Sequence, residues 1–266
     1  MPASETFRYL EASPGSDVRP RGTLVLIHAF PLNARMWEPQ LTLAEGGWRV
    51  IAPHLRGMDG SPHAAPVESV DDYAADVIDL LDALHIEDAV IGGLSMGGYV
   101  ALALFRRAPR YFRGMVLADT RPDADTPEAT GDRKRLLTVV REKRPASVAD
   151  EMLPKLLGET TRRDRPDLVA RVRNLVLSNS ADALAGAIQA LMTRPDSTSL
   201  LRSVRCPTLI LVGDEDTVTP PALSFDMHRA IGGAELAVIP RAGHLSSIEQ
   251  PEAFNAALAR FLEHRI

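Results

Sequence analysis

Short, almost uninterrupted runs of apolar residues recur along the chain, separated by longer stretches with helical spacing of apolar positions. Six of these runs are rich in β-branched side chains: residues 22–30, 49–55, 89–94, 115–119, 208–213 and 236–240. Continuous apolar runs of this length are typical of strands buried on both faces, as in a parallel sheet. A further strand near residues 7–11, with another near Val18, is expected to add an antiparallel edge.

Amphipathic helical patterns lie between the apolar runs. Residues 71–85 place their apolar side chains on one face, residues 96–108 are followed by a proline, and residues 251–264 begin with one. Proline is tolerated in the first turn of a helix and stops a helix when it follows one. Strands that alternate with helices form βαβ units. The pattern therefore predicts an α/β fold with a mostly parallel central sheet flanked by helices.

The alternation stops between residues 121 and 202. This stretch opens with a loop rich in Asp, Thr and Pro at residues 121–130 and contains no convincing strand. It contains four helical patterns, at residues 133–143, 148–157, 168–177 and 181–192. We therefore expect a core made of residues 1–120 and 203–266. Residues 121–202 are expected to form a helical cap, or lid, inserted between two late strands of the sheet.

Residues 93–97, Gly-Leu-Ser-Met-Gly, follow a G-x-S-x-G pattern at the junction of a predicted strand and a predicted helix. A strand that turns sharply into a helix leaves the serine in a strained backbone conformation with its hydroxyl exposed. Small residues two positions before and after it avoid backbone clashes, and the helix start directs amide groups at the site. Ser95 is the predicted nucleophile. The alternatives are a glycine-rich turn with an incidental serine and a dinucleotide-binding loop, which requires different glycine spacing.

A serine hydroxyl is a weak nucleophile at neutral pH and needs a histidine base oriented by an acid. In enzymes with this type of turn, the chain order is serine, acid, histidine. His244 lies in a loop after the last predicted strand, where Gly243 leaves the loop free to aim the ring. His228 falls within a helical pattern and His264 near the end of the chain, so both are expected at the surface. His244 is the predicted base.

Three consecutive acidic residues, Asp214, Glu215 and Asp216, follow the apolar run at 208–213. A residue a little beyond the strand end, before the next helix, reaches across to the histidine best. We therefore favour Asp216 as the acid and Asp214 as the second choice. Asp119, which ends an earlier strand, is a third candidate.

These motifs together resemble the α/β-hydrolase family over nearly the whole chain. In chain order they are His28-Ala29-Phe30-Pro31, the Arg-Gly turn at 56–61, Gly-Leu-Ser-Met-Gly-Gly at 93–98, Gly-Asp-Glu-Asp at 213–216, and Gly-His at 243–244 followed by Glu249-Gln250-Pro251. The set is highly specific for the α/β-hydrolase fold and weakly specific for the substrate. Within the family, the chain looks like small bacterial carboxylesterases and 3-oxoadipate enol-lactonase-like members.

The resemblance implies an oxyanion hole made of the backbone N–H groups of Met96 and Phe30. Losing one such donor typically costs about 3–4 kcal/mol of transition-state stabilisation. Ala29 stands where relatives usually have glycine, and Asp59 stands where they have a second glycine, so the two loops are expected to differ in shape. Trp37 is a candidate for the wall of the substrate pocket, but core packing is the favoured interpretation because a tryptophan at a helix start buries well.

The reaction implied by the resemblance is a two-step acyl transfer. Ser95 attacks the carbonyl of a carboxylic ester, His244 takes its proton, and Asp216 holds the ring. The expected substrate is a small or medium-sized apolar ester. The alternatives are an enol-lactonase or other lactone hydrolase, a perhydrolase that uses peroxide as acyl acceptor, and a hormone-receptor-like member with slow turnover. Halide and epoxide chemistry is disfavoured because such relatives carry aspartate at position 95.

Composition and charge limit the classes of partner that the protein is expected to bind. The net charge of −5 does not suggest a nucleic-acid partner, and the basic residues around 133–144 are expected to form a solvated helix face. No apolar run approaches the length of a membrane span, and residues 1–10 lack the pattern of a signal peptide. The lone Cys206 excludes an internal disulfide, and no cysteine–histidine cluster has metal-ligand spacing. We expect a cytoplasmic enzyme without cofactor, metal or membrane partner, acting on a small-molecule ester or lactone.

Overall fold

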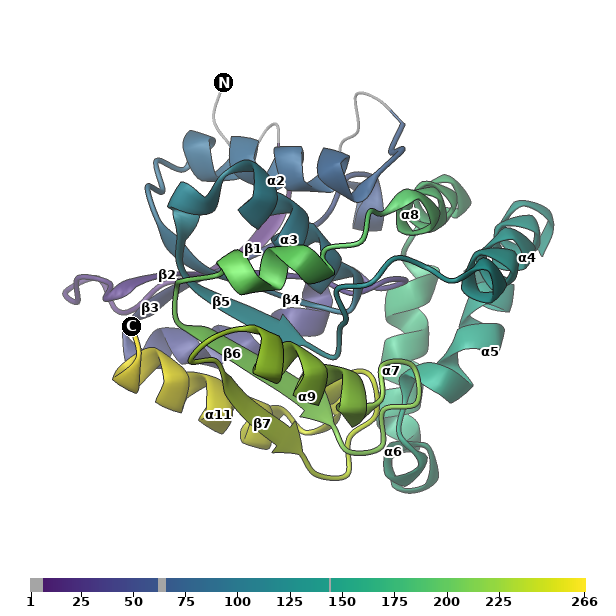
Figure 1. Ribbon diagram of the computed structural model, residues 1–266. Helices are drawn as coiled ribbons and strands as arrows, with labels where there is room; N and C mark the ends of the chain where they lie inside the picture. The colour runs from purple at the N-terminus through teal and green to yellow at the C-terminus, as the bar shows by residue number, and fades with distance from the viewer. Residues whose placement is uncertain (1–6, 62–65, 144) are drawn as a thin grey trace.

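Seven strands form one sheet in the order β1-β3-β2-β4-β5-β6-β7 (Figure 1). The computed structural model describes residues 7–61, 66–143 and 145–266, so residues 1–6, 62–65 and 144 of the predicted core and cap lie outside the described residues. The strands are β1 (Tyr9–Ala12), β2 (Gly22–Ile27), β3 (Trp48–Pro53), β4 (Ala89–Leu94), β5 (Phe112–Ala118), β6 (Thr208–Gly213) and β7 (Glu235–Ile239). β1 pairs antiparallel with β3, and every other pairing is parallel.

The six apolar runs all contain strands, and the predicted mostly parallel sheet is confirmed. β4 and β6 are buried along their whole length, as expected for strands covered on both faces. The prediction of a second edge strand near Val18 is wrong. Val18 is 54% exposed and lies at a turn, where its N–H donates to the Gly15 carbonyl. A single apolar residue among polar neighbours lacks the alternation that pairs a strand.

The helices outside the central insertion cover the sheet. They are α2 (Val70–Ala83), α3 (Met96–Arg107), α9 (Pro221–Ala230), α10 (Ser246–Glu249) and α11 (Pro251–His264), together with the 3₁₀ helices η1 (Ala34–Gly46), η2 (Met58–Gly60), η3 (Pro109–Tyr111) and η4 (Thr198–Ser203). α2 and α3 lie over one face, and α11 lies on the other (Figure 1). α11 buries Phe254, Leu258 and Phe261 on the apolar stripe that its sequence predicts.

Five α-helices lie between β5 and β6, in the stretch expected to form the cap. They are α4 (Pro127–Lys143), α5 (Pro145–Leu156), α6 (Glu159–Asp164), α7 (Pro166–Leu177) and α8 (Ala181–Thr193). They lie beyond the carboxyl ends of the parallel strands (Figure 1). The helix α4 begins at Pro127, inside the predicted loop, and α6 was not predicted because its sequence, ETTRRD, has no apolar stripe. In the described ranges no single helix is long and apolar enough to cross a membrane; only α7 and α8 together pass that test, and they meet at 92°.

η1 and α11 pack on each other through two aromatic side chains. The ring centroids of Trp37 and Phe254 are 6.0 Å apart with a 50° angle between the planes. Both side chains are almost fully buried, at 1% and 0% exposure. This contact anchors the C-terminal helix, which is separated from the loop that carries His244 only by the short helix α10.

Phe254→Ala is expected to lower the free energy of unfolding by about 3–5 kcal/mol, because the removed ring leaves a cavity between η1 and α11. Urea unfolding followed by circular dichroism measures the change. Arg260→Ala on the exposed face of the same helix is the control and should shift stability by no more than about 0.5 kcal/mol. A loss below about 1 kcal/mol for Phe254→Ala would contradict this packing.

Candidate active site

The turn between β4 and α3 holds Ser95 in an uncommon backbone conformation. Its φ is 55° and its ψ is −114°, a combination that costs free energy for any residue other than glycine. Two contacts from β5 and the residues after it hold the turn. The Ser95 N–H donates to the Ala118 carbonyl at 2.9 Å, and the Thr120 hydroxyl donates to the Ser95 carbonyl at 2.8 Å. The neighbouring strand therefore stabilises the strained serine.

The glycines on either side of Ser95 are required by close backbone approach. A Cβ atom built on Gly93 would lie 2.1 Å from the Gly97 backbone, and one on Gly97 would lie 2.0 Å from the Ile27 carbonyl oxygen. Both distances are far shorter than any real contact, and the opposing atoms are backbone that cannot move aside. The G-x-S-x-G pattern is thus a packing requirement of this turn.

Ser95, His244 and Asp216 form a continuous hydrogen-bonded chain. His244 Nε2 lies 2.8 Å from Ser95 Oγ, and His244 Nδ1 lies 2.8 Å from Asp216 Oδ2. The three residues follow β4, β7 and β6, so the carboxyl ends of three parallel strands bring them together. His244 and Asp216 are 1% and 3% exposed. The structure thus joins the three residues that the sequence analysis selected.

Asp216 is surrounded by hydrogen-bond donors. Its Oδ1 accepts from the amides of Val218 and Thr219, and its Oδ2 accepts from the Thr219 hydroxyl at 2.6 Å. Burial raises the pKa of this carboxyl, but the neighbouring His244 and these hydrogen bonds outweigh burial and leave the pKa below its ordinary value. An ionised Asp216 can only accept, so it fixes the proton of His244 on Nδ1. Nε2 then has a lone pair directed at the Ser95 hydroxyl.

The other acid candidates do not reach His244. Asp214 is exposed, and its Oδ1 accepts from the Ala242 amide at 3.3 Å. Asp119 is buried beside the site, where Oδ1 accepts from the Gly213 amide at 2.8 Å and Oδ2 accepts from the Ser246 hydroxyl. Burial, and then the charge of Asp216, raise the pKa of Asp119 well above its ordinary value. Two carboxyls close together in the site therefore have opposite pKa shifts.

Two further buried histidines belong to the loops beside the site. His28 Nε2 accepts from the Leu55 amide at 3.0 Å, and Nδ1 donates to the Ala29 carbonyl at 3.1 Å. Burial lowers the pKa of His28 to about 3 and that of His54 to about 4, so both rings are neutral near pH 7. The hydrogen bonds of His28 link the loop after β2 to the loop after β3.

The backbone amides of Phe30 and Met96 are free to donate into the site. Both residues line the cavity at Ser95, and in the described part of the chain neither N–H has an acceptor. Ala29 is not among the residues with positive φ, so alanine carries no left-handed backbone strain there. Asp59 does occupy the left-handed region, with φ 46°, at the position where relatives carry glycine. Its N–H donates to the side chain of Asn179, so a residue of the cap holds this turn.

A cavity of about 70 Å³ opens at Ser95. It is lined by Phe30, Ser95, Met96, Tyr99, Arg121, Arg133, Met152, Leu156, Leu191, Val218, Thr219 and His244. Trp37 is not among them, so its assignment to the pocket wall is corrected: it packs in the core against Phe254. The expectation of a solvated basic face is also wrong for Arg133, whose side chain is only 20% exposed. No sequence signal separated Arg133 from the exposed Arg135 two positions later.

Glu249 ties the His244 loop to the cap. Its Oε1 accepts from the amides of Gly243 and Leu245, and its Oε2 accepts from the Gly158 amide between α5 and α6. A Cβ atom on Gly243 would lie 2.2 Å from the Gly158 nitrogen, so the two backbones pass in direct contact. Glu215 makes a parallel link by accepting from the amide and hydroxyl of Thr160. The cap is thus anchored to both loops that carry the acid and the histidine.

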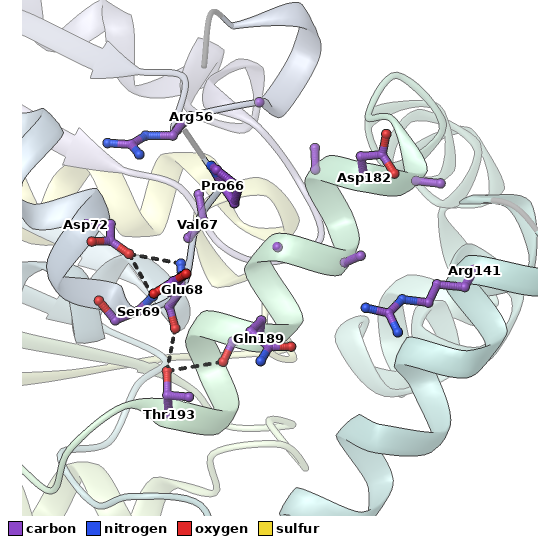
Figure 2. A pocket seen from close by; sticks show the side chains of 15 residues that line it. Arg56, Pro66, Val67, Glu68, Ser69, Asp72, Arg141, Asp182, Gln189 and Thr193 are labelled. Carbon is purple, nitrogen blue, oxygen red and sulfur yellow. Dashed lines mark hydrogen bonds between the residues drawn. The ribbon is translucent and has the colours of Figure 1, made fainter. Parts of the chain in front are cut away.

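A larger cleft of about 1210 Å³ lies between residues 56–57 and 66–72 on one side and helix α8 on the other, with Arg141 of α4 at its far side (Figure 2). Among the described residues that line it there is no histidine or cysteine. Asp72 accepts from the amides of Glu68 and Ser69 and so caps α2, while Arg56 pairs with Asp76. Among the described residues, no group of three or more His, Cys, Asp or Glu is placed to hold a metal ion. The small cavity at Ser95 is therefore the better candidate for the active site.

Comparisons with known proteins agree with this geometry. Residues 24–257 match the alpha/beta hydrolase family. The chain is 37% identical to a thermophilic esterase from Thermogutta terrifontis solved with malate bound, with a TM-score of 0.90 over 97% of this chain and 93% of that one. It is 25% identical to the enol-lactonase from Burkholderia xenovorans, with a TM-score of 0.88 over 97% and 96% of the two chains. It is 29% identical to 3-oxoadipate enol-lactonase 2 of Acinetobacter baylyi over 238 residues, covering 90% of this chain and 87% of the relative.

Asp119→Asn is expected to gain stability relative to the native protein as pH rises above about 4. The native pKa of Asp119 is raised, so its favourable contribution is complete below the unfolded pKa and is lost as pH rises through the folded pKa. Asparagine cannot ionise and escapes this loss. Urea unfolding at a series of pH values from 4 to 8 measures the difference.

The exposed Asp17→Asn is the control for this comparison, and its offset from the native protein should stay constant over the same pH range. Parallel stability profiles for Asp119→Asn and the native protein above pH 4 would show that the Asp119 pKa is not raised.

Proposed function

Because the chain belongs to the alpha/beta hydrolase family, we propose that it is a carboxylic ester hydrolase that works through an acyl-enzyme on Ser95. The observation that carries the proposal is the hydrogen-bonded chain from Ser95 through His244 to Asp216, with both bonds at 2.8 Å. A nucleophile within reach of a base, which is itself oriented by an acid, is the arrangement that activates a serine for acyl transfer.

In the first step, His244 Nε2 takes the hydroxyl proton while Ser95 Oγ bonds to the ester carbonyl carbon. The carbonyl oxygen becomes an oxyanion that accepts hydrogen bonds from the amides of Met96 and Phe30. Both residues line this cavity, and neither amide has an acceptor in the described residues, so both are available to bind the charge. Asp216 stabilises the imidazolium. His244 then gives the proton to the departing alcohol, and the acyl group stays on Ser95.

In the second step, water takes the place of the alcohol. His244 removes a proton from the water, the resulting hydroxide attacks the acyl carbon, and the same two amides hold the second oxyanion. Collapse of this intermediate returns the proton to Ser95 Oγ and frees the carboxylic acid. The cycle uses Ser95, His244, Asp216, the two backbone amides and one water molecule.

The cavity wall supports a small substrate. Residues 121–202 are taken as the cap, and they contribute the apolar Met152, Leu156 and Leu191 to the lining, together with Arg121 and Arg133. A volume of about 70 Å³ accommodates only a few non-hydrogen atoms around the reacting carbonyl. The three apolar side chains support an apolar portion of the substrate.

Lactone hydrolysis is the second candidate function. Two of the relatives described above are named enol-lactonases, and the other is an esterase solved with malate bound. The same residues would open a lactone, with the alcohol remaining attached to the acyl group as a hydroxy acid. A panel of simple esters and lactones, compared by kcat/KM, distinguishes the two.

Ser95→Ala is expected to lower kcat for p-nitrophenyl acetate by about 10⁴-fold or more, and Asp216→Asn by about 10⁴-fold. The first change removes the nucleophile, and the second removes the acceptor that fixes the His244 proton. Release of p-nitrophenol measures both. Ser203→Ala, an exposed serine on η4, is the matched control and should turn over normally. Full activity in Ser95→Ala would refute the proposal. A single burst of p-nitrophenol from the native protein, with no further turnover, would favour a ligand-binding protein.

A further inference from the structure

Two arginines share the cavity with Ser95 and His244. Arg121 lies in the segment after β5, and Arg133 lies on α4; their side chains are 21% and 20% exposed. The twelve lining residues include no aspartate or glutamate. A guanidinium stays charged at any ordinary pH, and removing it from water is unfavourable unless an anion compensates. The charge balance around these two side chains therefore decides what the cavity can bind.

A single buried carboxylate, that of Asp125, forms ion pairs with three arginines. It is bonded to Arg133 Nε, lies 2.5 Å from Arg194 Nη1 and lies 3.4 Å from Arg121 Nη2. Its side chain is 1% exposed, yet Arg133 and Arg194 outweigh burial and hold its pKa below the ordinary value. Asp125 therefore contributes one negative charge against three positive charges.

Both terminal nitrogens of Arg194 are bound by the protein, while its buried Nε has no hydrogen-bond partner among the described residues. Its Nη1 donates to Asp125 and to the Leu191 carbonyl, and its Nη2 donates to the Asp123 carbonyl at 2.9 Å. Its guanidinium carbon lies 4.3 Å from the centre of the Tyr99 ring. Arg194 thus holds the segment after β5 in place, and it is not one of the residues lining the cavity.

Arg121 and Arg133 are incompletely compensated. The Asp123 carboxylate lies 3.4 Å from Arg121 Nη1 but is 38% exposed, so water screens it. Counting both aspartates against the three arginines still leaves one positive charge. Within the described ranges, Arg133 Nη1 and Nη2 contact no acceptor. These two nitrogens form the kind of planar fork that binds a carboxylate through two parallel hydrogen bonds.

We propose that Arg121 and Arg133 bind a carboxylate group of the substrate, so that the preferred substrate is an ester or lactone carrying a carboxylate close to the reacting carbonyl. This inference rests on the proposed function. Because Arg121 and Arg133 line the same cavity of about 70 Å³ as Ser95, we expect a short chain of atoms between the two groups. The apolar walls then contact the chain between them, while the arginines fix the end of the molecule and hence the position of the carbonyl at Ser95.

Two matched pairs of esters test the inference and locate the carboxylate. The first pair compares mono-p-nitrophenyl glutarate, whose carboxylate is on the acyl side, with the neutral p-nitrophenyl hexanoate. The second pair compares 4-acetoxybenzoate, whose carboxylate is on the alcohol side, with the neutral 4-acetoxybenzamide. The native protein is expected to show a kcat/KM at least about 10-fold higher for the anionic member of one pair, and the pair that shows it identifies the side. Equal kcat/KM within both pairs would overturn the inference but leave the ester hydrolase proposal intact. If no ester of either pair is hydrolysed, both proposals fail.

Variants assign the preference to the two arginines. Arg121→Gln leaves Asp125 paired with Arg133 and Arg194, so the cap should stay folded; thermal unfolding checks this for every variant. Arg121→Gln and Arg133→Gln are each expected to reduce the anionic-to-neutral ratio of kcat/KM by about 10- to 100-fold. Arg133→Lys should retain part of it because the charge remains. Arg141→Gln, an exposed arginine on the same helix, should keep the native ratio. An unchanged ratio in both glutamine variants would overturn the assignment.

Discussion

The contact between Gly97 and the Ile27 carbonyl is the constraint on which the site depends. A side chain at position 97 would collide with that oxygen, so the start of α3 lies directly on the end of β2 only because residue 97 is glycine. This contact places the amide that begins α3, at Met96, beside the loop that leaves β2 with Phe30. It also forces the chain to turn at Ser95 into the strained conformation that exposes the hydroxyl. The positions of the predicted nucleophile and of both amide donors thus depend on the same backbone contact.

Three buried carboxyls gather at the carboxyl ends of the strands, and their surroundings give them different properties. Asp216 faces His244 and the donors of Thr219, so its pKa is lowered. For Asp119 and Glu249, burial is the largest influence, and their pKa values are raised. Asp119 and Asp216 repel each other as anions, and this repulsion is one of the causes that raise the pKa of Asp119. The pKa of each carboxyl therefore depends on its hydrogen-bond donors and neighbouring charges as much as on its burial.

Sequence reasoning was most successful where the local sequence pattern is compatible with few structures. Continuous apolar runs located the strands, and the chain order of Ser95, Asp216 and His244 selected residues that the structure places in one hydrogen-bonded chain. For Trp37, the structure shows the favoured core packing, against Phe254 of α11 more than two hundred positions away. Sequence reasoning failed where the answer depends on packing between distant segments. Arg133 has the same local sequence signature as its exposed neighbours, and only the fold turns it towards Asp125 and the cavity.

The glycine-to-glycine contact between Gly158 and Gly243 has a consequence for how molecules enter and leave. Pulling the α5–α6 junction away from the core would strip the Gly158 donor from Glu249 and the Thr160 donors from Glu215. That separation would also disturb the loop that aims His244, because Glu249 holds Gly243 and Leu245 with its other oxygen. This end of the cap is therefore held in place. Substrate and product are expected to reach and leave Ser95 without separation of the α5–α6 junction from the core. In protein engineering terms, α4 and α8 can be redesigned for new substrates more safely than the α5–α6 junction.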